Sequence, residues 1–235
     1  MATKTIYHDQ VGEVTIYKRR GTSKVTLKVV NNKIKIIQPT WLPYAAGKSF
    51  LADNIGWLKK QSLSNEQKII ESGQKIGKNH DIYFHADNKL RSRVHESTID
   101  IFYDQASQGS FSPEVQLLAK KAIKRAVNIE ANQYLPSRLE SVANSIDCNY
   151  KSLTIKPMKS RWGSCSSKQE IKLNCYLMFM PWEVIDYVLV HELSHTKHLN
   201  HSSSFWQMVE ENLPDYKARK KTLKIMQAEV SAFQI

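Results

Sequence analysis

The first hundred residues alternate apolar and polar positions in the manner of β-strands. Two such runs between residues 25 and 36 flank Asn31-Asn32, and asparagine tolerates the positive φ of tight turns, so a hairpin is predicted here. Further strands are predicted at 13–19, Ile82–His85 and Thr98–Tyr103. Residues 1–105 are therefore expected to form a β-rich N-terminal region, interrupted by a helix at 46–70.

The spacing of apolar residues changes after a small polar stretch, Gln105–Ser112. Apolar residues recur every three or four positions over Pro113–Tyr134, which predicts a helix. Its opposite side is basic, and a solvated face explains that stripe as well as a nucleic-acid interface does. We therefore divide the chain into 1–105 and 112–235, with the polar stretch between as a linker.

The second half is predicted to hold a hairpin followed by two helices. The hairpin arms are Arg161–Ser166 and Ile171–Met178, and Pro181 suits the first turn of the next helix, with Asn200 as its stop. Serines at 202–204 offer N-caps for a last helix. The predicted fold class is α+β.

Composition narrows the class of protein but not its function. Apolar residues make up 41% and charged residues 24%, which is ordinary for a globular protein. The most apolar run, Cys175–Trp182, is too short to span a bilayer, and no secretory signal is visible, so a cytoplasmic protein without a membrane partner is expected. Three widely spaced cysteines predict free thiols and neither a disulfide framework nor a cysteine zinc site.

The formal net charge is +12, with +7 in residues 1–110 and +5 in residues 111–235. A basic surface can attract nucleic acid, although no recognised nucleic-acid motif accompanies it. Nucleic acid is therefore left open as a partner.

The chemistry is concentrated in His191-Glu192-Leu193-Ser194-His195. Residues four apart on a helix lie about 40° apart in projection, so both imidazoles can bind one metal ion. The glutamate beside them can reach a water bound to Zn²⁺ and take its proton as the water attacks a carbonyl. The pattern predicts a zinc site with Glu192 as the general base, because a purely structural site needs no base there.

A catalytic zinc ion normally takes a third protein ligand. His201 has the spacing of the metzincin pattern, with His198 in the place of that pattern's central glycine. His198 itself, or Glu210 or Glu211 from the following helix, remains an alternative third ligand.

These residues resemble the YgjP-like metallopeptidase family, which is related to the SprT-like and Wss1-like zinc proteases. The resemblance is carried by Arg161-Trp162-Gly163-Ser164-Cys165, Leu173-Asn174, the 191–195 motif, Asn200-His201-Ser202 and Phe205-Trp206. It implies a zincin-like catalytic domain behind the β-rich region, with His191, His195 and His201 as metal ligands. The substrate is not implied.

Three functions remain open at this point. The first is hydrolysis of peptide bonds in a protein or peptide substrate, in which Arg161 either stabilises the oxyanion or pairs with a structural carboxylate. The second is a nucleic-acid-associated protein with a structural or targeting metal site, and the third is hydrolysis of a non-peptide amide. An open strand edge beside the histidines would favour a peptide, because an extended chain binds by adding a strand. We predict that the 161–178 hairpin provides this edge.

Overall fold

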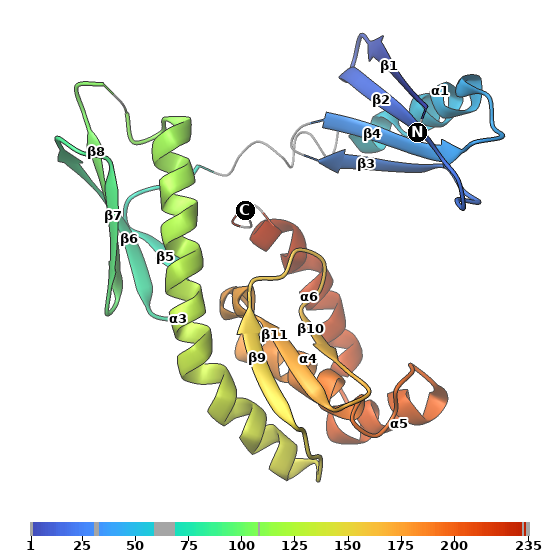
Figure 1. Cartoon of the computed structure of the whole chain (residues 1–235). Helices are drawn as coiled ribbons and strands as arrows, with labels where there is room; N and C mark the ends of the chain where they lie inside the picture. The colour runs from blue at the N-terminus through green and yellow to red at the C-terminus, as the bar shows by residue number, and fades with distance from the viewer. Residues whose placement is uncertain (1, 31–32, 59–68, 108, 232, 234–235) are drawn as a thin grey trace. The chain divides into compact units, whose positions relative to one another are not determined.

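The computed structural model describes residues 2–30, 33–58, 69–107, 109–231 and 233 (Figure 1). The chain divides into two compact units, Met1–Gln67 and Lys68–Ile235. This division differs from the predicted one at 105–112. The reason is packing: Ile82 and Ile99 belong to the same hydrophobic core as Val115 and Ala119 beyond the expected linker.

The first unit is a four-stranded sheet with one helix. Its strands are β1 (Thr3–His8), β2 (Gly12–Arg19), β3 (Thr26–Val30) and β4 (Lys33–Pro39), and its helix is α1 (Tyr44–Asp53). The strand order is β1-β2-β4-β3, and only the β2–β4 pair is parallel. The antiparallel β3–β4 pair confirms the predicted hairpin, although its Asn31-Asn32 turn lies outside the described residues, as do 59–68 of the predicted helix.

A second sheet opens the larger unit and lies against a long helix. It contains β5 (Gln74–Ile76), β6 (His80–Asp87), β7 (Arg91–His95) and β8 (Thr98–Asp104), in the order β5-β6-β8-β7. Both strands predicted in this stretch are present.

The long helix, α3 (Pro113–Ser145), starts where the sequence predicts, because Ser112 accepts a hydrogen bond from the Val115 amide. It continues past Tyr134 and through Pro136, with Leu135 and Leu139 buried beyond the predicted end.

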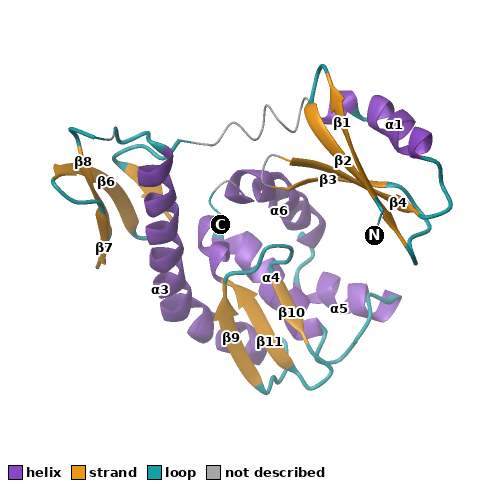
Figure 2. Cartoon of the chain, turned by 45° about the horizontal axis from the view of Figure 1, so that its top comes forward, coloured by secondary structure: helices purple, strands orange, loops and turns teal. Residues whose placement is uncertain are grey.

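The third sheet and the remaining helices complete this unit (Figure 2). The sheet has the order β10-β11-β9, and the elements are β9 (Ser152–Lys156), β10 (Gly163–Cys165), β11 (Glu170–Asn174), η1 (Cys175–Phe179), α4 (Trp182–Ser194), α5 (Ser203–Asn212) and α6 (Tyr216–Ser231). Helices beside three mixed sheets confirm the α+β class. Among the described helices, none is both long enough and apolar enough to cross a membrane.

The second arm of the predicted hairpin is shorter than expected. Strand β11 ends at Asn174, whose side chain accepts a hydrogen bond from the Tyr176 amide and donates to the carbonyl oxygens of Met158 and Arg161. These bonds turn the chain into the short helix η1 and fix the loop that leads into β10.

Candidate metal centre

Helix α4 carries the first half of the site. Pro181 precedes its first residue, Glu183 lies in its first turn, and Leu189 and Leu193 are among its fully buried residues. These apolar contacts hold the helix against the core, so that His191 and Glu192 are presented from a rigid element.

The helix ends at Ser194, with His195 as its C-cap, and not at Asn200 as the sequence predicted. Two bonds close its last turn: the Thr196 hydroxyl donates to Leu193 O at 2.7 Å, and the His198 amide donates to Ser194 O at 2.9 Å. The chain therefore leaves the helical path directly after His195.

This early exit brings His201 back to the helix. Possible ligand atoms of His191, His195 and His201 all lie within 4.8 Å of one another. The Nε2 atoms of His191 and His201 are 3.1 Å apart. His195 places its Nδ1 3.0 Å from the carbonyl oxygen of His198, a bond that fixes the ring and leaves Nε2 for a metal.

The donor set fits a divalent transition metal. Burial, together with the neighbouring His195 and His201, lowers the pKa of His191 to about 3, and the pKa of His201 is also lowered by burial. Neutral imidazoles are the form that binds metal. Three nitrogen ligands with one position left for water are the usual set of a catalytic zinc ion.

Helix α5 packs against this histidine cluster. Ser202 accepts a hydrogen bond from the Phe205 amide and so starts the helix directly after His201. The fully buried ring of Phe205 lies 4.5–5.0 Å from the rings of all three histidines, and Trp206 stacks on His201 at 5.6 Å. The sequence placed both aromatic residues in the motif but did not predict that they form the floor of the site.

The alternative third ligands lie outside the cluster. The backbone of His198, and not its ring, contacts His195. Glu210 accepts a hydrogen bond from Lys217, and Glu211 accepts one from Gln207. The structure therefore assembles the three histidines favoured by spacing and leaves the other candidates apart.

Glu192 lies next to the imidazoles and is almost fully buried. Its Oε2 has no hydrogen-bond partner among the described residues. Burial raises the pKa of Glu192 to about 8, and the charge of Arg161 acts in the opposite direction. A buried carboxyl oxygen without a partner is costly, and a buried carboxyl group with a raised pKa is typical of functional sites.

Gly163 on β10 makes room for Glu192. A Cβ added at Gly163 would lie 2.5 Å from Glu192 Oε1 and 2.6 Å from its Cγ. The sequence predicted no role for this glycine. Its position in a strand was the available signal, since an internal strand glycine often marks a close approach of another group.

Two hollows flank the buried carboxylate, and Arg161 borders both. One, of about 330 Å³, is lined by Arg161, Gly163, Ser164, Cys165, His191, Glu192, His195, Leu199 and His201. The other, of about 210 Å³, is lined by Arg161, Trp162, Gly163, Tyr187, Val188, His191, Glu192 and Leu223. Arg161 is exposed and forms no ion pair within the described part of the chain, so no structural carboxylate neutralises it there.

The hairpin has an open strand edge, as predicted, and this edge belongs to its first arm, β10. Strand β11 is interior because it pairs with β10 and β9, whereas β10 is at the end of the sheet order. All three residues of β10 line the same hollow as the histidines. One of them, Cys165, has a thiol whose pKa is raised to about 11 by burial and by the charge of Glu192. All three cysteines are free thiols, as predicted.

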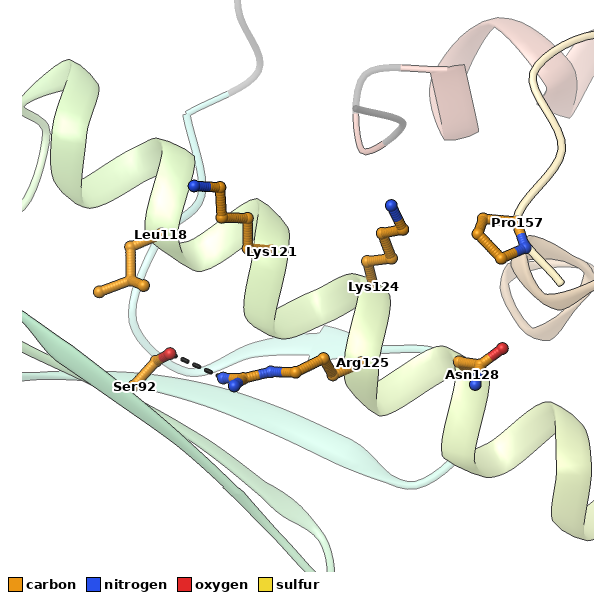
Figure 3. A pocket seen from close by; sticks show the side chains of 7 residues that line it. All are labelled: Ser92, Leu118, Lys121, Lys124, Arg125, Asn128 and Pro157. Atoms are coloured by element: carbon orange, nitrogen blue, oxygen red, sulfur yellow. Dashed lines mark hydrogen bonds between the residues drawn. The ribbon is translucent and has the colours of Figure 1, made fainter.

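A larger hollow of about 500 Å³ lies elsewhere on this unit, along α3 (Figure 3). It is lined by Ser92, Leu118, Lys121, Lys124, Arg125, Asn128 and Pro157, and Arg125 donates a hydrogen bond to the Ser92 hydroxyl at 2.7 Å. None of the clustered histidines lines it. Its size therefore does not make it the reaction site.

Comparison with known proteins gives a family match and similar solved structures. The family model described as "YgjP-like, metallopeptidase domain" matches residues 23–226. The crystal structure of the metallopeptidase zymogen abylysin of Pyrococcus abyssi is similar over 37% of this chain and 88% of its own, at 30% identity and a TM-score of 0.33. The zymogen jannalysin of Methanocaldococcus jannaschii is similar over 38% of this chain and 90% of its own, at 28% identity and a TM-score of 0.33. No curated protein matches the chain.

Proposed function

Because the chain belongs to the YgjP-like metallopeptidase family, we propose that it is a zinc-dependent peptidase with Glu192 as its general base. His191, His195 and His201 are the proposed metal ligands. One observation carries the proposal: the three imidazoles converge beside a buried carboxyl group, one oxygen of which has no hydrogen-bond partner in the described part of the chain.

Zinc is proposed from the chemistry of the donor set, which consists of imidazole nitrogens alone. When bound, the ion supplies Lewis acidity that polarises a carbonyl group and lowers the pKa of water to about 7. The His195–His198 contact keeps one ligand ring oriented, and Phe205 packs against all three rings.

The proposed task of Glu192 is proton transfer. In its ionised form, a buried carboxyl group beside the metal ligands can accept a proton from the attacking water and pass it to the leaving amine. Gly163 allows the carboxyl group to lie against β10, so the proton acceptor has a fixed position. Arg161 is proposed to stabilise the negative charge that develops on the carbonyl oxygen, since it borders both hollows and forms no ion pair with another described residue.

A peptide is the proposed substrate because β10 offers an edge. An extended chain can pair its N–H and C=O groups with that edge while one carbonyl group reaches the histidines. A small non-peptide amide gains nothing from a strand edge, which is why the peptide is preferred over the other amide substrates.

The experiment uses the full chain and its Glu192→Gln variant. Both proteins are assayed for zinc by elemental analysis and for cleavage of a mixed peptide library by mass spectrometry. We expect about one zinc per chain in both proteins and cleavage only by the wild type, because glutamine fills the same space but cannot accept a proton. A variant that cleaves at the wild-type rate would rule out Glu192 as the base, and a wild-type protein without zinc would rule out the metal assignment.

A further inference from the structure

The positive charge of this protein is concentrated in its small unit. Met1–Gln67 contains eleven lysine and arginine residues against four aspartate and glutamate residues, a net +7. The other 168 residues carry the remaining +5. A division of the sequence at residue 110 does not reveal this difference in net charge, because residues 68–110 contain six basic and six acidic residues. The unit outside the metal centre is therefore the more basic one.

One face of this unit's sheet is covered by its own helix. Val14 and Ile16 of β2 and Ile36 of β4 are fully buried, and Leu51 of α1 belongs to the same core. Figure 2 shows α1 along this side of the sheet. Because side chains alternate along a strand, the residues between these positions lie on the opposite face.

We call that opposite side the open face and define it by Tyr7, Thr15, Tyr17, Arg19, Lys28 and Lys35. The register places Thr15 and Lys28 on either side of Lys35. The Lys35 ammonium lies 5.9 Å from the centroid of the Tyr17 ring, and Tyr7 is 79% exposed. Glu13, which pairs with Tyr7 in the register, is the one acidic residue on this side of the strands among the described residues.

We propose that the open face binds single-stranded nucleic acid. Each feature has a counterpart in that ligand: the tyrosine rings can stack on bases, the ammonium and guanidinium groups can contact phosphates, and the threonine hydroxyl can hydrogen-bond to sugar or phosphate oxygens. A duplex fits less well, because its major groove admits a helix or a two-stranded ribbon and not the width of a four-stranded sheet. An acidic peptide would use the cations but would leave the two rings without a role. The proposal does not depend on the peptidase activity.

The test measures binding of the full chain to a fluorescein-labelled oligothymidylate of about 16 nucleotides, a length within the known range of site sizes. Fluorescence anisotropy is recorded over a series of salt concentrations. The test variant is Lys28→Gln with Lys35→Gln. The matched control is Lys24→Gln with Lys48→Gln, which removes the same charge from an exposed loop residue and an exposed residue of α1.

We expect the open-face pair to weaken binding at least tenfold and to reduce the log–log salt slope by about 1.4, which is about 0.7 per lost phosphate contact. The control pair should have a much smaller effect. Tyr17→Leu should weaken binding at least fivefold and Tyr17→Phe should not, because only leucine loses the ring. Circular dichroism of each variant checks that the fold is retained.

Three results would overturn the proposal. Equal losses in the two lysine pairs would mean that only net charge matters. Equal binding by Tyr17→Leu and the wild type would remove the stacking role and favour another anionic partner. Absence of binding at low salt, or tighter binding of a duplex of the same length, would reject single-stranded nucleic acid as the ligand.

Discussion

Replacement of Gly163 by alanine would show how strictly strand β10 positions the general base. The added Cβ would lie 2.5 Å from Oε1, 2.6 Å from Cγ and 2.7 Å from Cδ of Glu192. Ordinary contact begins at 3.4 Å, so either the carboxyl group moves by about 0.9 Å or β10 moves away from α4.

The side chain is expected to move and the backbone to stay. The carboxyl group is the end of a flexible side chain, whereas β10 is hydrogen-bonded to β11. Overpacking of this kind costs about 1–3 kcal/mol, which a protein of this size tolerates. A displacement of about 1 Å at a catalytic group lowers the rate by roughly 100-fold. No histidine atom is among the three nearest atoms met by the new Cβ, so the zinc content should not change.

The assay compares kcat/KM on a cleaved peptide, zinc per chain and the melting temperature. Gly109→Ala is the matched control, because a Cβ there meets nothing within 4 Å. Wild-type kcat/KM in Gly163→Ala would refute the positioning argument. Loss of zinc in parallel with activity would also refute it, since the damage would then lie in the metal site.

Other predictions concern the histidines, Arg161 and the pH dependence of stability. His201→Ala should weaken zinc binding far more than His198→Ala in a chelator competition, because only the His201 ring lies in the cluster; equal losses would contradict this. Arg161→Ala should retain zinc and lower kcat/KM by roughly 100-fold. Because the Arg161 charge lowers the pKa of Glu192, the acid limb of the pH–rate profile should shift to higher pH in this variant, and an unchanged acid limb would contradict this. In metal-free protein, burial raises the pKa of Glu192 from 4.5 to about 8, so its contribution to stability is complete below pH 4.5 and is lost as the pH rises through 8. Thermal unfolding should show a drop in stability between pH 5 and pH 9 that is smaller in Glu192→Gln, and equal drops in both proteins would contradict this.

Local patterns in the sequence were enough to predict several elements of the fold, but not β1, β5, β7, β9 or α6. Residues close together in the chain determine the apolar face of α3, the β3–β4 hairpin and the start of α5. Ser112 at the start of α3 and Ser202 at the start of α5 are examples. The boundary between the units depends instead on long-range packing. Ile82 and Ile99 lie before the polar stretch but pack with Val115, and no local signal separates such a sheet from an independent domain.

The same distinction holds within the metal centre. His191, Glu192 and His195 follow from spacing along one helix, and His201 follows from a short return of the chain. The contact between Gly163 and Glu192 joins different elements and requires knowledge of which strand edge faces α4. The sequence predicted an edge beside the histidines but could not determine that β11 would be paired on both sides.

The early end of α4 explains why His201, and not His198, joins the cluster. On a helix continued to Asn200, His198 would lie three residues after His195 and close to the same face, about 60° away in projection. The helix ends instead at Ser194, and the turn that ends it directs the carbonyl oxygen of His198 toward His195 Nδ1. His198 thus contributes its backbone to the orientation of one ring, while the chain beyond it is free to return. Ser202 then starts α5 at a point that places His201 over Phe205. The end of α4 therefore has two consequences. It allows the backbone of His198 to orient the His195 ring, and it turns the chain so that His201 joins the cluster.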